Sequence, residues 1–213
     1  MGWFKRGVIE KSGTFTIAGE THPERSYGYL AVRWSVDNAA VMLERVLKIQ
    51  TTAQTTSLVS RIKEDAWRVF TQSQVLYIAM YLAYAKVCLN VSERAMSEIY
   101  IGFQDGLKDL LAPNKLPIDI KLQSYIQKEV KSYISIIEDE LSSDVQPGTV
   151  DFTGGLTCNA FIRSLHLLYS KNPAAPDTFD KQEILQLTAQ LSHNPTKFML
   201  ILRDEINIKY ELA

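Results

Sequence analysis

One cysteine stands at a position that can make a thiol reactive. Cys158 follows a loop that contains Gly154, Gly155 and Thr157, and the apolar residues after it repeat with helical spacing. The pattern predicts a helix from about Cys158, capped by Thr157. Because free amides and the dipole of a helix start stabilise anions, Gly154, Gly155, Thr157 and Cys158 form a candidate anion or thiol site.

The sequence supplies no clear partner for that thiol. His166 lies eight residues further along the same predicted helix, which is about 12 Å of rise, so it cannot assist Cys158 directly. A base would have to come from His22 or His193 across the fold. The simpler interpretation is that Cys158 is a small side chain packed at a helix start.

Metal-ligand patterns are missing from the sequence. The three histidines are far apart, and neither they nor Cys88 and Cys158 have the spacing of zinc ligands. Phosphate-loop, dinucleotide-binding and nucleophile-elbow motifs are absent as well. We therefore predict no catalytic set, no metal and no cofactor.

Three tyrosines form a stripe on the most apolar segment of the chain. Tyr77, Tyr81 and Tyr84 lie at positions i, i+4 and i+7 between residues 75 and 85, so a helix projects them from one face. Such a stripe packs in a core, or it lines an interface or a ligand slot where the hydroxyl groups stay wet. Both interpretations remain open at this point.

Composition narrows the classes of protein. The 213 residues are 46% hydrophobic and 22% charged, with a net charge of −1, which is typical of a globular domain and lacks the basic excess of a nucleic-acid binder. Two cysteines are too few for a disulfide framework and favour a reducing compartment. No secretion signal is found, and the longest apolar run is too short to cross a membrane. We expect a cytoplasmic protein without membrane insertion.

Hydrophobic periodicity predicts an all-α fold with seven or eight helices in a bundle or orthogonal array, within a single domain over residues 1–213. Residues 1–20 are expected to form an N-terminal arm or hairpin, with strands at 7–10 and 14–17 and a turn at 11–13. Residues 142–156 are the main internal loop. The helices are expected at about 29–49, 57–87 with a bend at 71–74, 91–111, 119–141, 158–169, 180–191 and 196–210.

Local signals add detail to two of these helices. Asn90 and Glu93 have the spacing of a capping box at the start of the helix 91–111, and Asp180 and Glu183 have it at another helix start. Gly102 and Gly106 lie four residues apart within the helix 91–111. This spacing allows a neighbouring helix to approach closely.

Three functions follow from these patterns. The first is a protein–protein interaction domain, adaptor or regulatory, that has no catalytic activity and binds another protein or itself as a homodimer. The alternative is an enzyme or anion-binding protein that uses the glycine loop and Cys158. The third is a small-molecule sensor with a ligand between helices near Tyr77, Tyr81 and Tyr84.

Overall fold

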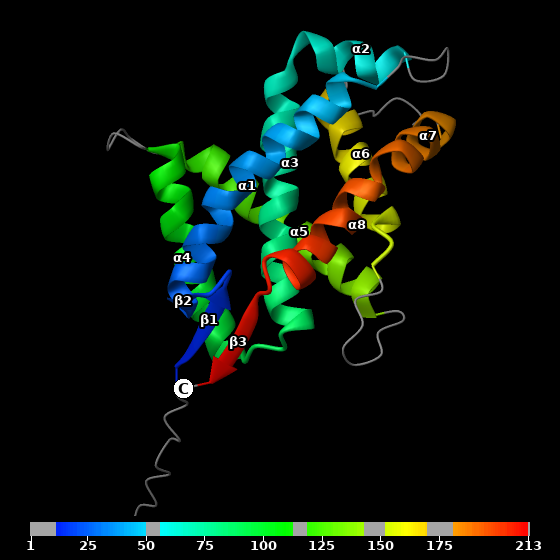
Figure 1. The fold of residues 1–213 in the computed structure, drawn as a ribbon. Helices are drawn as coiled ribbons and strands as arrows, with labels where there is room; N and C mark the ends of the chain where they lie inside the picture. Colours follow the sequence, from blue (N-terminus) through cyan, green and yellow to red (C-terminus); the bar gives the residue numbers. More distant parts are fainter. Residues whose placement is uncertain (1–11, 50–55, 113–118, 143–151, 170–180, 213) are drawn as a thin grey trace, which may run out of the picture.

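The computed structural model describes residues 12–49, 56–112, 119–142, 152–169 and 181–212. The described part confirms the all-α class and the N-terminal hairpin (Figure 1). The helices are α1 (Glu24–Leu47), α2 (Thr56–Glu64), α3 (Ala66–Ala83), α4 (Glu93–Leu111), α5 (Ile120–Ser142), α6 (Gly155–Tyr169), α7 (Lys181–Leu191) and α8 (His193–Leu200). Two single π-helical turns, η1 (Tyr84–Cys88) and η2 (Ile201–Glu205), continue α3 and α8. The strands are β1 (Gly13–Ile17), β2 (Glu20–Pro23) and β3 (Lys209–Leu212).

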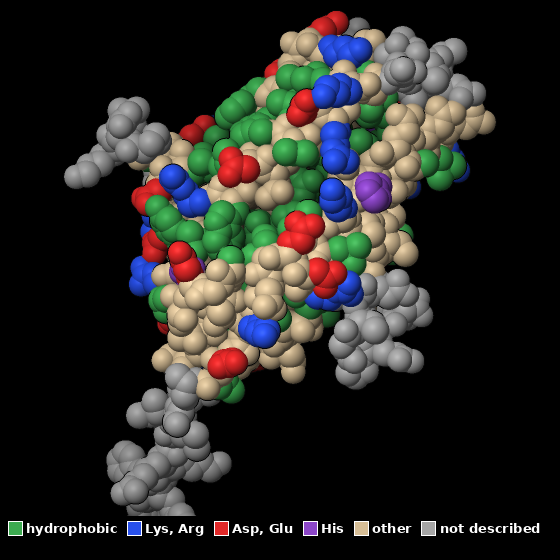
Figure 2. Space-filling model, viewed as in Figure 1, with side chains coloured by type: hydrophobic (Ala, Val, Ile, Leu, Met, Phe, Trp, Pro, Cys, Tyr) green, Lys and Arg blue, Asp and Glu red, His purple; other side chains and the backbone are tan. Residues whose placement is uncertain are grey.

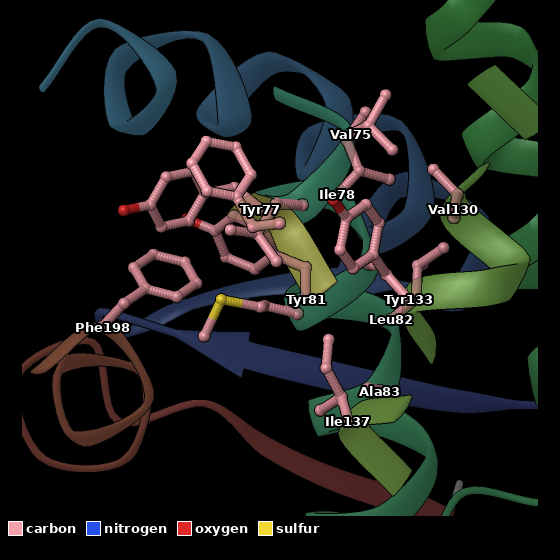
Figure 3. Close-up of a cluster of buried hydrophobic side chains, with 14 of the residues drawn as sticks. Val75, Tyr77, Ile78, Tyr81, Leu82, Ala83, Val130, Tyr133, Ile137 and Phe198 are labelled. Atoms are coloured by element: carbon pink, nitrogen blue, oxygen red, sulfur yellow. The ribbon is translucent and has the colours of Figure 1, made fainter. Parts of the chain in front are cut away.

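Helix α3 is the central element of the fold. Every side chain from Gln72 to Ala83 is buried, because α1, α5 and α6 all pack against this helix (Figure 1). Figure 3 shows side chains of α3 facing Val130, Tyr133 and Ile137 of α5. The most apolar run of the sequence therefore lies in the core, and the buried residues form one contiguous cluster.

Helices α1 and α4 pack at very short range. A Cβ atom added to Gly102 would lie 1.8 Å from the backbone oxygen of Arg25, and one added to Gly28 would lie 1.9 Å from that of Ile99. Gly106 also faces α1 closely. The close approach predicted for Gly102 and Gly106 is confirmed, and Gly28 is its counterpart on α1.

The hairpin lies later in the sequence than expected. Strand β1 pairs with β2 in the register Ile17↔Glu20, and the turn is Ala18-Gly19, with φ values of 51° and 87°. The predicted turn at 11–13 is wrong in that Gly13 belongs to a strand, and the predicted strand 7–10 lies outside the described residues. A two-residue turn with positive φ matches the twist of the paired strands, which explains its place at Gly19.

The C-terminal segment forms a strand where a helix was expected. The predicted helix 196–210 ends at η2, Asn207 takes a φ of 49°, and β3 then pairs antiparallel with β1 so that Phe15 faces Tyr210. The sheet order is β2-β1-β3. Helical spacing is a local signal, whereas this strand depends on an edge supplied by the other end of the chain.

Buried Glu24 joins the two ends of the chain. Its carboxylate accepts the backbone N–H of Gly13 at 2.9 Å and the hydroxyl of Tyr210 at 2.6 Å. Because Glu24 opens α1, these bonds attach β1 and β3 to the first helix. They also explain why α1 starts at Glu24 and not near Tyr29.

Other helix boundaries differ from the prediction in informative ways. The break before α3 falls at Asp65, and α3 continues through residues 71–74 as one helix. Ser92 caps α4, accepting the Ala95 amide at 3.2 Å, whereas Asn90 has a φ of 49° and precedes the cap. The capping box predicted at Asn90 is therefore wrong by two residues.

Candidate functional site

The start of α6 binds a carboxylate that belongs to the chain itself. Glu140, near the end of α5, is buried and its Oε2 accepts the amide of Thr157 at 3.0 Å and the hydroxyl of Thr157 at 2.7 Å. Its Oε1 accepts the amide of Leu156 at 3.2 Å and the hydroxyl of Thr153 at 2.8 Å. Thr157 lies inside the helix and does not cap it as predicted, because Glu140 takes that role.

The glycine loop before α6 packs against the turn between α7 and α8. Gly154 has a φ of 69°, and a Cβ there would lie 2.8 Å from the Ser192 carbonyl oxygen and from the Thr196 hydroxyl. That hydroxyl donates to the Thr153 carbonyl at 2.7 Å. The loop needs glycine for its backbone and its tight contacts, whether or not it binds a ligand.

Cys158 is fully buried behind this loop. Its thiol faces the Thr188 carbonyl oxygen at 3.8 Å, and burial together with the charge of Glu140 raises the pKa of the thiol to about 12. A raised pKa opposes the thiolate that a nucleophile needs. The alternative function that depends on Cys158 gains no support from this geometry.

The histidines lie on different elements. His166 of α6 is buried with its Nε2 3.5 Å from Oε2 of Glu183 on α7, while His22 is on β2 and His193 opens α8. Within the part of the chain that the structure describes, no group of histidine, cysteine, aspartate and glutamate side chains could hold a metal ion.

The tyrosine stripe faces the interior of the fold. Phe198 of α8 meets Tyr77 and Tyr81 edge-on, with ring centroids 4.8 and 5.1 Å apart (Figure 3). Burial raises the pKa of both tyrosines well above the ordinary value, and that of Tyr84, in η1, to about 12. Tyr77 also lines one surface cavity, and Tyr81 lines another.

The first cavity, called here the sheet-end cavity, has a volume of about 520 Å³ and lies between the terminal sheet and α1. Its apolar walls are Ile17, Leu30, Trp34, Tyr81 and Ile206. The acidic residues Glu20 and Asp37 line it together with His22, and both acidic side chains are exposed.

The second cavity, called here the α8-end cavity, has a volume of about 220 Å³ and lies between α1 and α8. Tyr77, Val41 and Phe198 line it together with the exposed basic residues Arg45 and Lys197. The Arg45 guanidinium donates a hydrogen bond to Asn194 in the same cavity.

Asn38 lines both cavities and joins them into one groove. The α1 residues along it are Leu30, Trp34, Asn38, Val41 and Arg45, whose spacing of three and four residues places them on one helix face. From Leu30 to Arg45 this face is about 22 Å long. We call the two cavities and this face the α1 groove.

The α1 groove carries apolar residues along its length, and its two cavities are lined by charges of opposite sign. Figure 2 shows hydrophobic side chains exposed over α1, with basic side chains in a column beside them and acidic ones nearby. Val41, in the α8-end cavity, is 49% exposed. The charged residues are Glu20 and Asp37 in the sheet-end cavity, and Arg45 and Lys197 in the α8-end cavity.

Comparison of the chain with protein-family models, with curated proteins and with solved structures finds no match. Among the described helices, none has both the length and the hydropathy that crossing a membrane requires.

The sequence prediction missed the α1 groove. The sequence predicted a helix at 29–49 but no groove along it. In the structure Ala31, Val32, Ala39, Met42 and Val46 form the buried side of α1, and Leu30, Trp34 and Val41 line the groove. The signal in the sequence was that this helix carries more apolar residues than one buried face requires.

Proposed function

We propose that this protein acts by binding another protein, and that the partner docks in the α1 groove. The observation that carries the proposal is the partly exposed apolar face of α1, which runs through two cavities lined by charges of opposite sign. Trp34 is partly exposed in this groove, and tryptophan is a frequent anchor of protein interfaces because it buries a large area at a small entropic cost.

The shape of the groove favours an elongated occupant. A length of about 22 Å accommodates roughly 15 residues of a helix, and a partner helix would present apolar side chains every three or four residues to this surface. Charge complementarity further predicts that such a segment carries a basic residue opposite Asp37 and an acidic residue opposite Arg45. We favour a partner segment of this kind over a second copy of the chain.

Both cysteines are free thiols in the structure, which agrees with a reducing compartment. We therefore look for the partner among cytoplasmic proteins, in keeping with an adaptor or regulatory role.

Photo-crosslinking from single positions tests this function. A photoreactive phenylalanine analogue is placed at Val41 in the groove or, as the matched control, at Ile101 on α4, which is 40% exposed. The protein is expressed and irradiated in its native cells. We expect one discrete adduct from Val41 that is absent from Ile101.

The identity of the adduct separates the alternatives. Mass spectrometry of a Val41 adduct that names a second polypeptide supports the proposal. An adduct between two copies of this chain would overturn the proposal in favour of a homodimer. The absence of an adduct, or equal adducts from Val41 and Ile101, would also overturn the proposal.

The small-molecule sensor remains the second candidate, because the sheet-end cavity falls in the size range of ligand pockets. It predicts that a metabolite raises the melting temperature of the wild-type protein. A Trp34→Ala variant should lose that rise, whereas Trp67→Ala, which changes an exposed tryptophan on α3, should keep it.

A further inference from the structure

We infer that the sheet-end cavity receives a positively charged side chain of the docked partner, an arginine in particular. This inference rests on the proposed function, and it names the chemical group that this end of the α1 groove recognises. It predicts a basic residue in the partner at that point, and no such requirement at the α8 end.

An aromatic ring in the sheet-end cavity favours a cation there. Trp34 is partly exposed where it lines the sheet-end cavity, and the buried ring of Tyr81 packs behind it, with ring centroids 5.5 Å apart at 43°. Tryptophan and tyrosine faces attract cations through their negative ring faces, and the attraction grows when the cation leaves water. The planar guanidinium also stacks on such rings, which favours arginine over lysine.

Two carboxylates also favour a cation in the sheet-end cavity. Glu20 on β2 and Asp37 on α1 both line the cavity, and among the residues that the structure describes its wall contains no lysine or arginine. His22 is the one basic group among the described lining residues, and its Nε2 lies 3.8 Å from the Glu20 carboxylate. A partner guanidinium there would meet the Trp34 ring and the carboxylate oxygens of Glu20 and Asp37, with which it can form short paired hydrogen bonds.

The apolar walls of the cavity and the charges at the far end of the groove also favour an arginine at the sheet end. Ile17, Leu30 and Ile206 offer contacts to the methylene stem of an arginine, which packs on apolar surface while its head reaches the charged rim. Arg45 and Lys197 would repel the same cation from the α8-end cavity. The charge distribution therefore sets one orientation of the partner along α1.

Nuclear magnetic resonance on the full-length ¹⁵N-labelled protein tests the inference directly. The probe is N-acetyl-arginine methylamide, and the control is N-acetyl-citrulline methylamide, which has nearly the same shape without the charge. The readout is the indole N–H signal of Trp34, assigned with a Trp34→Phe variant. We expect a saturable shift with arginine and binding at least about tenfold weaker with citrulline.

A double variant, Glu20→Gln with Asp37→Asn, should weaken arginine binding about fivefold or more, as should raised salt. The control Glu64→Gln changes an exposed carboxylate on α2 and should leave binding unchanged. Equal shifts from arginine and citrulline, or no saturable shift, would overturn the inference. Circular dichroism of both variants establishes that they are folded.

A last measurement separates this inference from the proposed function. If the cation belongs to the partner, the double variant should lower the Val41 photo-adduct several-fold. An unchanged adduct would mean that the partner docks without this contact, and the inference alone would fail. Arginine binding without any Val41 adduct would assign the cavity to a free ligand, and then both would fail.

Discussion

The carboxylate of Glu140 accepts two hydrogen bonds from Thr157, one from its amide at 3.0 Å and one from its hydroxyl at 2.7 Å. This relationship joins the end of α5 to the start of α6 and satisfies amides that a helix start otherwise leaves open. It also places a buried negative charge beside Cys158, where it opposes ionisation of the thiol.

Glu140→Gln should therefore destabilise the protein. The glutamine retains one acceptor, but its NH₂ group faces a donor, so a loss of about 1–3 kcal/mol in the free energy of unfolding is expected. Urea denaturation at neutral pH measures it. The control Glu138→Gln removes the charge of a partly buried carboxylate that pairs with half-exposed Lys86, and a loss below about 1 kcal/mol is expected. Equal losses in the two variants would show that Glu140 has no special role.

Cys158 should resist alkylation in the folded protein. In a Cys88→Ser background, Cys158 is the single thiol, and its pKa of about 12 leaves very little thiolate at pH 8. We expect labelling on the order of a hundredfold slower than that of a peptide thiol, with full speed restored in urea. Rapid labelling of the native protein would revive the enzyme alternative.

Gly102→Ala should separate α1 from α4. Its added methyl group would meet the Arg25 backbone, which cannot move aside as a flexible side chain does, and such overpacking costs about 1–3 kcal/mol. In Gly155→Ala, the nearest atom outside the adjacent residues lies 3.6 Å from the new methyl group, so stability should change by at most about 0.5 kcal/mol. Thermal melting compares the two. A Gly102→Ala protein as stable as Gly155→Ala would contradict the tight helix contact.

Alkaline pH should unfold the protein. Burial raises the pKa of Tyr133 far above 10 and that of Tyr125 to about 12, so the folded state keeps these phenols neutral while the unfolded state ionises them. Stability is complete below about pH 10 and falls as the pH rises towards 12. Absorbance at 295 nm should report tyrosinate in step with the loss of helical circular dichroism. Tyrosine ionisation well before unfolding would count against the burial of these groups.

Much of the secondary structure could be predicted from local pattern. Periodic apolar residues predicted the helices, including the buried run of α3, because each amphipathic helix carries its own spacing. Gly102 and Gly106 predicted close helix packing, because only glycine permits it. The hairpin was predicted with a misplaced turn, since both Gly13 and Gly19 favour a turn and the structure places it at Ala18-Gly19.

The sequence by itself determined the all-α class, most of the helices and the position of a helix start near Cys158. Only the tertiary structure decided that Glu140 fills that helix start, that residues 209–212 form a strand, and that Leu30, Trp34 and Val41 lie along a groove. The physical reason is the same in each case. Hydrogen-bond partners and burial depend on groups distant in sequence, and the local spacing of residues carries no record of them.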